Sequence, residues 1–485
     1  MRGLWLGLDV GTQSTKALVV DGDARRVVAR ASVAYDLIAG LPEGAAEQDP
    51  KTWADAVVAC LRQVSDQGVD LSSVRGVGVS GQQHGLVLLD AAGGVVRPAK
   101  LWCDTATASE AAVLSERFGR AVPTGFTASK ILWVQEHEPE NWAKTATVML
   151  PHDYINFLLT GRRTMEVGDA SGSGLFDPVA RGFNGREVEL MGGGVGDRLP
   201  ELVEAPEPVG AVSAAGSSWC GLPAGALVSA GGGDNMMSAI GSGATTPGPV
   251  VLSLGTSGTV FACADRAVID PDGLIAPFCD STGRYLPLLC TMNVTGVTEE
   301  VREAFGMDHG ALTERASSVA AGCEGLLWLP FLAGERVPDL PTASGTLTGM
   351  RHGWLDPAVL FRAAIEGTTL NLAWGAKRMA GLGVSIDAVR VVGGGSKNAL
   401  WRQVAADVFG VPVVTLEEPE SAALGGAIQA MWTEACGSDV SADLGAVGEG
   451  LIRTGGEVEP SASGVAAYAG VYERYCGALA RVYGV

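Results

Sequence analysis

The sequence predicts a two-domain α/β protein, and three observations support this prediction. The chain has 485 residues, whereas one hydrophobic core usually organises ~100–200 residues. Short apolar runs alternate with longer segments of helical periodicity, which is typical of a sheet covered by helices. Similar sequences also open the two halves of the chain, so we expect one plan to occur twice.

The first half opens with a predicted β-meander and then a helix. Asp49 and Pro50 form a helix cap with proline at the first helical position, and apolar residues recur at helical spacing from Trp53 to Val64. The predicted strands of this half are Leu4–Val10, Thr15–Val20, Arg26–Ala34 and Val74–Val79.

The second half repeats this opening. The sequence LDVGTQST at residues 8–15 aligns with LSLGTSGT at residues 252–259, and one difference is that Asp9 corresponds to Ser253. We therefore predict domains at residues 1–244 and 245–485. The strands expected after the boundary are Val250–Leu254, Thr259–Ala264, Ala388–Val392 and Val411–Leu416. The expected helices are a long amphipathic one at Pro357–Met379 and others at Lys397–Phe409, Ser421–Trp432 and Ala467–Val482.

Composition and charge exclude several classes of protein. Lys and Arg number 34 against 54 Asp and Glu, a net charge of −20, and no basic patch is evident, so we expect no nucleic-acid partner. The nine cysteines form no CxxC pair and indicate reduced thiols without a zinc site. No secretion signal or long apolar span is evident, which predicts a cytoplasmic protein without membrane insertion.

Glycine-rich turns after apolar strands are candidates for phosphate binding, because closely spaced backbone N–H groups can surround an anion. Three such turns occur, at residues 11–15, 255–258 and 393–396. The sequence has neither a P-loop motif nor a dinucleotide fingerprint after the first strand. Plain hairpins are the alternative interpretation of these turns.

Three polar groups at strand ends suit phosphoryl transfer to a hydroxyl. Asp234 follows three glycines and could accept the proton of a hydroxyl, although it could also be a helix cap. Gln83 and His84 carry uncharged hydrogen-bonding groups that suit a polyhydroxylated ligand, or His84 could be structural. Asp9, beside the first turn, could hold Mg²⁺ through water or only cap that turn.

At this point the sequence resembles the FGGY family of carbohydrate kinases, and within it the xylulokinases, over essentially the whole chain. Residues 125–137, GFTASKILWVQEH, resemble the first family signature throughout. Residues 345–350, with Leu360 and residues 363–366, are similar to the second signature. Residues 330–338 also resemble a family segment, which we interpret as structural.

The resemblance implies two ribonuclease H-like domains of the actin and hexokinase type, with a cleft for sugar and Mg-ATP between them. It implies that Asp234 is the general base and that Asp9 is a catalytic and metal-binding residue for the Mg-ATP phosphates. The implied sugar-binding residues are Gln83, His84, Asp234, Asn235 and, by a weaker analogy that also includes Asp104, Trp102. The implied nucleotide-binding residues are Thr12, Ser14, Lys16, Gly255, Thr256, Gly394, Gly395 and Asn398.

The expected function is ATP-dependent phosphorylation of D-xylulose to D-xylulose 5-phosphate. Xylulokinases typically carry Met-His where this chain has Gln83-His84, so a kinase for ribulose or a sugar alcohol is the alternative within the family. A non-catalytic actin-like scaffold or a sugar-sensing regulator is the alternative from another class. Relatives often form homodimers, so a homodimer is possible for this chain as well.

Overall fold

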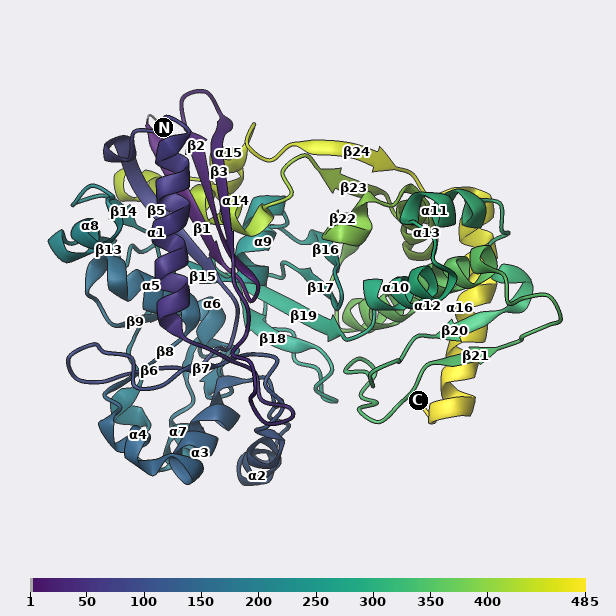
Figure 1. The fold of residues 1–485 in the computed structure, drawn as a ribbon, viewed down its shortest axis with the longest axis horizontal. Coiled ribbons are helices and arrows are strands. Elements are labelled where there is room, and N and C mark those ends of the chain that lie inside the picture. Colours follow the sequence, from purple (N-terminus) through teal and green to yellow (C-terminus); the bar gives the residue numbers. More distant parts are fainter. Residues whose placement is uncertain (1–2) are drawn as a thin grey trace.

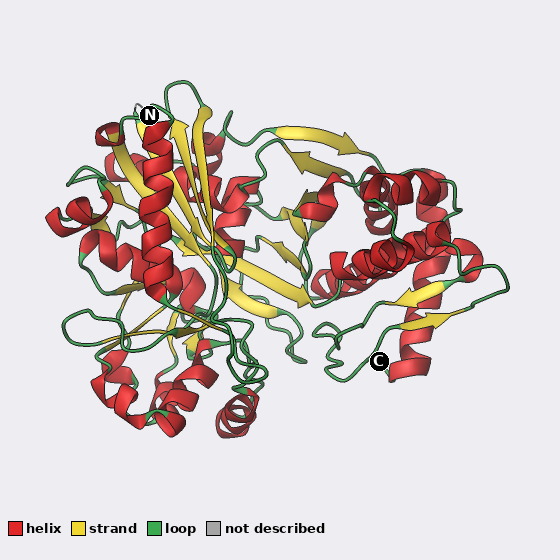
Figure 2. Cartoon of the chain, in the orientation of Figure 1, coloured by secondary structure: helices red, strands yellow, loops and turns green. Residues whose placement is uncertain are grey.

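The computed structural model describes residues 3–485, which form two lobes, each built on a seven-stranded mixed sheet (Figures 1 and 2). The order in the N-terminal lobe is β13-β14-β5-β1-β2-β3, with β15 also paired to β5. Its strands are β1 Leu4–Val10, β2 Ser14–Asp21, β3 Arg26–Ala34, β5 Val74–Gly81, β13 Gly210–Ala211, β14 Leu227–Val228 and β15 Gly232–Gly233.

The sheet of the C-terminal lobe has the order β18-β19-β17-β16-β22-β23-β24. Its strands are β16 Gly248–Leu254, β17 Gly258–Ala262, β18 Ala276–Cys279, β19 Tyr285–Thr291, β22 Ile386–Val392, β23 Val413–Leu416 and β24 Thr454–Val458. The five small two-stranded sheets pair β4 Glu47–Gln48 with β7 Ala99–Lys100, β6 Val87–Leu89 with β8 Thr147–Met149, β9 Thr164–Glu166 with β12 Glu201–Val203, β10 Phe176–Asp177 with β11 Gly182–Phe183, and β20 Leu327–Leu329 with β21 Thr346–Thr348.

The two main sheets share one plan. In each, a central strand pairs antiparallel with the next strand along the chain and parallel with a later one: β1 with β2 and β5, and β16 with β17 and β22. The central strands, Leu4–Val10 and Gly248–Leu254, keep one offset of 244 residues at both ends. The predicted repeat is confirmed, and so is the two-domain ribonuclease H-like fold class.

Helices cover both sheets and fill the connections between strands (Figure 1). They are α1 Pro50–Asp66, α2 Ala108–Phe118, α3 Thr127–His137, α4 Pro139–Lys144, α5 Pro151–Thr160, α6 Val167–Ala170, α7 Gly185–Met191, α8 Ala214–Cys220, α9 Asp234–Ser242, α10 Thr295–Phe305, α11 His309–Ser317, α12 Pro357–Gly381, α13 Ala399–Phe409, α14 Ser421–Ser438, α15 Leu444–Gly448 and α16 Ala462–Tyr483. Within residues 3–485, none of them combines the length and the apolar character that crossing a membrane requires.

Several of the predicted helices differ from the structure. The segment at 357–381 is a helix, but most of its residues are buried on all sides because α10, α11, α13 and β20 pack around it, so the amphipathic description is wrong. The helix expected from Lys397 begins at Ala399, because residues 394–397 form a 3₁₀ turn. The helix expected at Ser421–Trp432 continues to Ser438, and the one expected from Ala467 begins at Ala462. The other elements named above begin and end within two residues or so of their predicted bounds.

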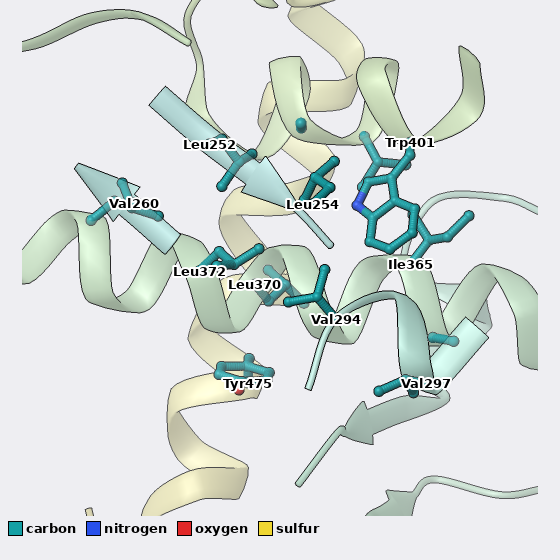
Figure 3. Close-up of a cluster of buried hydrophobic side chains, with 14 of the residues drawn as sticks. Leu252, Leu254, Val260, Val294, Val297, Ile365, Leu370, Leu372, Trp401 and Tyr475 are labelled. Carbon is teal, nitrogen blue, oxygen red and sulfur yellow. The ribbon is translucent and has the colours of Figure 1, made fainter. Parts of the chain in front are cut away.

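The core of the C-terminal lobe holds the strand ends of the site in place (Figure 3). Leu252 and Leu254 of β16 belong to one buried cluster with Leu370 and Leu372 of α12. In the same cluster, the indole N–H of Trp401 donates a hydrogen bond to Thr369 Oγ1 at 2.9 Å. The carboxyl end of β16, where a glycine-rich turn begins, therefore packs against the buried middle of α12.

Helix α14 lies in the second half of the sequence but packs on β1 and β5 of the N-terminal lobe (Figure 1). Glycines permit this contact: a Cβ on Gly7 would lie 1.7 Å from the carbonyl oxygen of Ala423, and one on Gly78 would lie 2.1 Å from that of Gly426. Helix α9 crosses α14 equally closely, since a Cβ on Gly425 would lie 1.9 Å from the Met237 oxygen. The division at residues 244 and 245 stays a prediction.

Candidate active site

A cavity of about 190 Å³ is lined by residues of both lobes. Asp9 of β1 and Ser253 of β16, which correspond in the repeat, both line it, so the two duplicated strand ends meet at one site. The full lining is Asp9, Lys16, Asp234, Asn235, Ser238, Ser253, Val392, Gly393, Pro419, Glu420, Ser421 and Ala422. The structure thus brings the predicted Asp9, Lys16, Asp234 and Asn235 together.

The chain delivers Asp234 to this cavity through the glycine run before α9. Gly232 and Gly233 form β15, which pairs with the end of β5, and Gly233 occupies the N-cap position of α9. Gln429 of α14 fixes the run from behind: its Oε1 accepts from the Gly231 N–H at 2.8 Å and its Nε2 donates to the Gly231 carbonyl at 3.0 Å. Asp234 is therefore the first residue of the helix and not its N-cap, and it lines the cavity.

The environment of Asp234 raises the pKa of its carboxyl group from 3.8 to about 7. Burial is the largest cause, and the neighbouring carboxylates Asp9 and Asp169 add to it. The backbone N–H and side-chain Nδ2 of Asn235 both donate to Asp234 Oδ1, at 2.8 and 2.9 Å, which works in the opposite direction. A carboxylate with a pKa near neutrality is suited to accept a proton from a hydroxyl.

Asp9 and Lys16 lie opposite each other on the antiparallel strands β1 and β2. Burial raises the pKa of Asp9, against the opposing effects of Lys16 and of the Ser80 hydroxyl, which donates to Asp9 Oδ1 at 2.9 Å. Lys16 Nζ also lies 2.5 Å from Glu420 Oε2. The sequence analysis missed Glu420, which reaches the cavity only because α14 packs on the N-terminal lobe.

The two glycine-rich turns of the C-terminal lobe lie together, because they follow the parallel neighbours β16 and β22. A Cβ on Gly395 would lie 2.8 Å from that of Leu254, the last residue of β16. At the other turn, the carbonyl oxygen of Gly255 accepts from the Thr295 N–H at 2.9 Å, and that of Thr256 accepts from the Val294 N–H at 3.0 Å. Of the two strands that lead into these turns, Ser253 and Val392 line the cavity, as does Gly393 at the start of the second turn.

Asn398, predicted to bind nucleotide, already has partners within the C-terminal lobe. Its Oδ1 accepts from the Trp401 N–H at 3.2 Å as the N-cap of α13, and its Nδ2 donates to Thr313 Oγ1 at 2.8 Å. Gly394, in the turn before it, is exposed. The side chain of Asn398 thus secures this turn against α11.

Thr12 and Ser14, predicted for the phosphates, lie in the first turn, where the Ser14 carbonyl accepts from the Gly11 N–H at 3.0 Å. The indole N–H of Trp102 donates to Thr12 Oγ1 at 2.9 Å, and that hydroxyl donates to Gln82 Oε1 at 3.1 Å. The side chain of Thr12 is therefore tied to Trp102, a residue predicted for the sugar. Asp104 is fully buried and accepts from Lys100 Nζ at 3.1 Å, which makes it a support of this loop.

Gln83 and His84 are both buried beside Asp234. His84 has a backbone φ of +61°, and its ring centroid lies 4.9 Å from that of Phe126 and 5.4 Å from that of Phe278. Burial lowers the pKa of His84 to about 4, so the imidazole is neutral at pH 7. Gln83 Oε1 accepts from Asn235 Nδ2 at 2.8 Å. The pair therefore offers neutral hydrogen-bonding groups, as predicted from its chemistry.

The sequence analysis missed two charged residues near the pair. Asp169 of α6 is fully buried: its Oδ2 accepts from His152 Nδ1 at 3.1 Å, and its Oδ1 lies 3.8 Å from His84 Nδ1. Arg336 comes from the C-terminal lobe and lies over the Trp102 ring, 5.9 Å from its centroid. Arg336 belongs to the segment 330–338, whose resemblance to the family was interpreted as structural. That resemblance was the one sequence signal that could have pointed to Arg336 as a site residue.

The fold and the site define a class of protein. Two ribonuclease H-like lobes that hold a carboxylate of near-neutral pKa between glycine-rich turns are the architecture of a phosphotransferase of the actin and hexokinase type. The chain belongs to the FGGY family of carbohydrate kinases, whose N-terminal domain matches residues 4–241 and whose C-terminal domain matches residues 250–434. As a carbohydrate kinase it uses ATP and a sugar as substrates.

Several individual proteins are similar to this chain over most of its length. A xylulose kinase of Haemophilus influenzae is 37% identical over 503 aligned positions, covering 99% of this chain and all of the relative. A xylulose kinase of Streptomyces coelicolor is 39% identical, covering 88% of this chain and 87% of the relative. The crystal structure of a xyloylose kinase from Brucella ovis has a TM-score of 0.91 and 30% identity, and the match covers 99% of both chains.

Proposed function

We propose that this chain transfers the γ-phosphoryl group of ATP to the terminal hydroxyl of D-xylulose, giving D-xylulose 5-phosphate and ADP. The main support for phosphoryl transfer is the environment of Asp234. This carboxylate has a pKa near 7 and lines a cavity shared by the two lobes. The xylulose kinases reported above, similar over 88–99% of the chain, support the choice of sugar.

In the proposed mechanism Asp234 acts as the general base. Its Oδ1 is held by two N–H groups of Asn235, so Oδ2 is the oxygen that accepts the proton of the sugar hydroxyl. The sugar oxygen attacks the γ-phosphorus in line, its new O–P bond forms as the β–γ bridging bond breaks, and ADP leaves with the bridging oxygen. Lys16 and the backbone N–H groups of the glycine-rich turns stabilise the charge of the phosphates.

Asp9 is the proposed ligand of Mg²⁺, and the chemistry of the cavity fits that ion. Asp9 offers carboxylate oxygen, the ligand that Mg²⁺ prefers, at the cavity wall. Mg²⁺ is commonly held by one or two carboxylates together with phosphate oxygens and waters, so a cage of protein ligands is not required. When bound, the ion neutralises charge on the triphosphate. The same proposal assigns the nucleotide to Thr12, Ser14, Lys16, Gly255, Thr256, Gly394, Gly395 and Asn398.

For the sugar we propose contacts with Gln83, His84, Trp102, Asp234 and Asn235. The neutral His84 can donate and accept hydrogen bonds. Gln83 Nε2 keeps one hydrogen besides the one it gives to the Met236 sulfur, and Asn235 Oδ1 keeps a lone pair besides the one that accepts from Thr259, so both can bind hydroxyl or carbonyl groups of a ketose. This chain has Gln83 where xylulokinases typically carry methionine. Ribulose or a sugar alcohol is therefore the second candidate for the sugar substrate.

The decisive experiment measures ADP release with Mg-ATP and each of D-xylulose, D-ribulose, L-ribulose, glycerol, xylitol and gluconate. We expect D-xylulose to give the highest kcat/KM and Asp234→Asn to lose turnover while still binding the sugar. If another sugar is preferred, the assignment of D-xylulose is wrong but that of Asp234 stands. If no sugar is phosphorylated, the non-catalytic alternative replaces the proposal.

Three further predictions concern the oligomeric state, the location and the domain division of the protein. A homodimer is checked by sedimentation of the purified chain, and a cytoplasmic location is checked by fractionation of cells that express it. The division into domains at residues 244 and 245 is checked by limited proteolysis, with cleavage between α9 and β16 as the expected result.

A further inference from the structure

The side-chain amide of Asn235 is hydrogen-bonded on every side. Its Nδ2 donates to Gln83 Oε1 at 2.8 Å and to Asp234 Oδ1 at 2.9 Å, which uses both hydrogens of the amide nitrogen. Its Oδ1 accepts from Thr259 Oγ1 at 3.2 Å. Flipping the amide would turn its oxygen toward two acceptors, the Gln83 carbonyl and the Asp234 carboxylate. The amide orientation is therefore determined by these three partners.

The two outer partners belong to different lobes. Gln83 follows β5 of the N-terminal sheet, whereas Thr259 lies in β17 of the C-terminal sheet, where it pairs with Cys290 of β19. Asn235 stands between them in the first turn of α9. The amide thus connects the two lobes immediately beside the proposed general base.

We propose that Gln83 and Thr259 are positioning residues that hold Asn235 from the two lobes, and that Asp234 is aligned for proton transfer only while both hold it. The inference deepens the proposed function and rests on it. Movement of the C-terminal lobe would withdraw the Thr259 hydroxyl and release the amide that fixes Asp234 Oδ1. The closing of the lobes and the alignment of Asp234 are then coupled. Asp234 accepts the proton only in the arrangement of the lobes that encloses the sugar.

A change at Asn235 also has a consequence for pH dependence. The carboxylates of Asp9 on β1 and Asp169 on α6 raise the pKa of Asp234, and Cys290 on β19 lies close enough to sense its charge. The two N–H groups of Asn235 lower the pKa of Asp234, in opposition to these carboxylates. Loosening Asn235 therefore moves the acid limb of the kcat profile to higher pH.

Thr259→Val tests this inference, because valine keeps the shape of threonine and removes the hydroxyl, and Thr259→Ser is the matched control. We expect Thr259→Val to lower kcat about three- to tenfold, the effect of one neutral hydrogen bond, with KM for sugar and for ATP within about twofold. The acid limb should move to higher pH, and Thr259→Ser should restore both readouts. Gln83→Met should also lower kcat and move the acid limb to higher pH, but, since Gln83 is a proposed sugar contact as well, it should raise KM for the sugar, which Thr259→Val should not. The double variant should lose less of kcat than the product of the two single losses.

The outcomes separate this inference from the proposed function. Wild-type activity on D-xylulose with unchanged kcat and pH profile in Thr259→Val would refute the positioning role and leave the function intact. If wild type prefers another sugar, the same variants are compared on that sugar. Crystal structures of wild type and Thr259→Val provide a readout without turnover. If the Asn235 side chain keeps its position in the variant and its Nδ2 stays as close to Asp234 Oδ1 as in wild type, the inference is overturned.

Discussion

Replacing Asp234 with asparagine should abolish turnover and at the same time stabilise the protein at neutral and alkaline pH. The folded pKa of Asp234, about 7, lies above the reference value of 3.8, so the folded state binds more protons between these two values. The stability that goes with this proton is complete below pH 4 and is lost as the pH rises through 7. Above pH 7 the folded protein carries a carboxylate that its site disfavours, whereas the amide of the substituted asparagine would carry no charge.

The magnitude follows from the pKa. The difference from 3.8 to about 7 corresponds to about 4 kcal/mol for a fully enclosed carboxyl group. Asp234 is partly exposed to the cavity, and solvent screening reduces the expected gain to about 1–2 kcal/mol at pH 8. That gain should raise the unfolding midpoint of the N-terminal lobe by about 2–5 °C.

The assay is thermal unfolding of wild type and Asp234→Asn at pH 4.5 and pH 8, with ADP release measured on the same preparations. We expect the two proteins to unfold at nearly the same temperature at pH 4.5 and to separate at pH 8, while loss of the general base lowers kcat about 10²–10⁴-fold. Asp55→Asn is a matched control, because this carboxylate is exposed on α1 and pairs with Lys51. An Asp234→Asn variant no more stable at pH 8 than wild type would refute the argument that burial and neighbouring carboxylates raise the pKa of this group.

Three other predictions follow from the same contacts. Hydrolysis of ATP without sugar should be slow, and a rate unchanged by omitting the sugar, measured by ADP release, would exclude control of Asp234 by lobe closure. Lys16→Met should lower kcat/KM for ATP about 10–100-fold through loss of a charged hydrogen-bond donor at the cavity; an unchanged value in steady-state kinetics would remove Lys16 from the phosphate site. Gly425→Ala should lower the free energy of unfolding by at least about 2 kcal/mol, since its Cβ would lie 1.9 Å from the Met237 oxygen. Gly437→Ala is the control on the same helix, because nothing lies within 4 Å of its Cβ, and it should not destabilise the protein in the same denaturant titration.

The repeat and most strands could be predicted because their signals are local. The apolar run from Leu4 to Val10 and its partner 244 residues later each carry their own pattern, and the turns that follow them are marked by glycine. The candidate residues Asp9, Lys16, Asp234 and Asn235 lie at strand or helix ends of this plan, and all four line one cavity.

The rest of the site depends on contacts between segments far apart in the sequence. Glu420 and Gln429 reach the N-terminal lobe only through the packing of α14, which no periodicity in residues 421–438 predicts. Asp169 is recognised by its contact with His152 and its approach to His84, and Arg336 by its position over Trp102. The amphipathic interpretation of α12 failed for the same reason, because its buried faces are set by four neighbouring elements.

The position of α14 also bears on how the protein is made. The sheet face around Gly7 and Gly78 belongs to the first part of the chain to leave the ribosome, but the helix that covers it begins at Ser421. At about 5–20 residues per second, synthesis from residue 245 to residue 421 takes about 10–35 s. During that interval the nascent N-terminal lobe exposes an apolar, glycine-lined surface shaped for one particular helix. Until α14 emerges, chaperones and unrelated nascent chains can reach that surface, so synthesis of residues 421–485 completes the first domain.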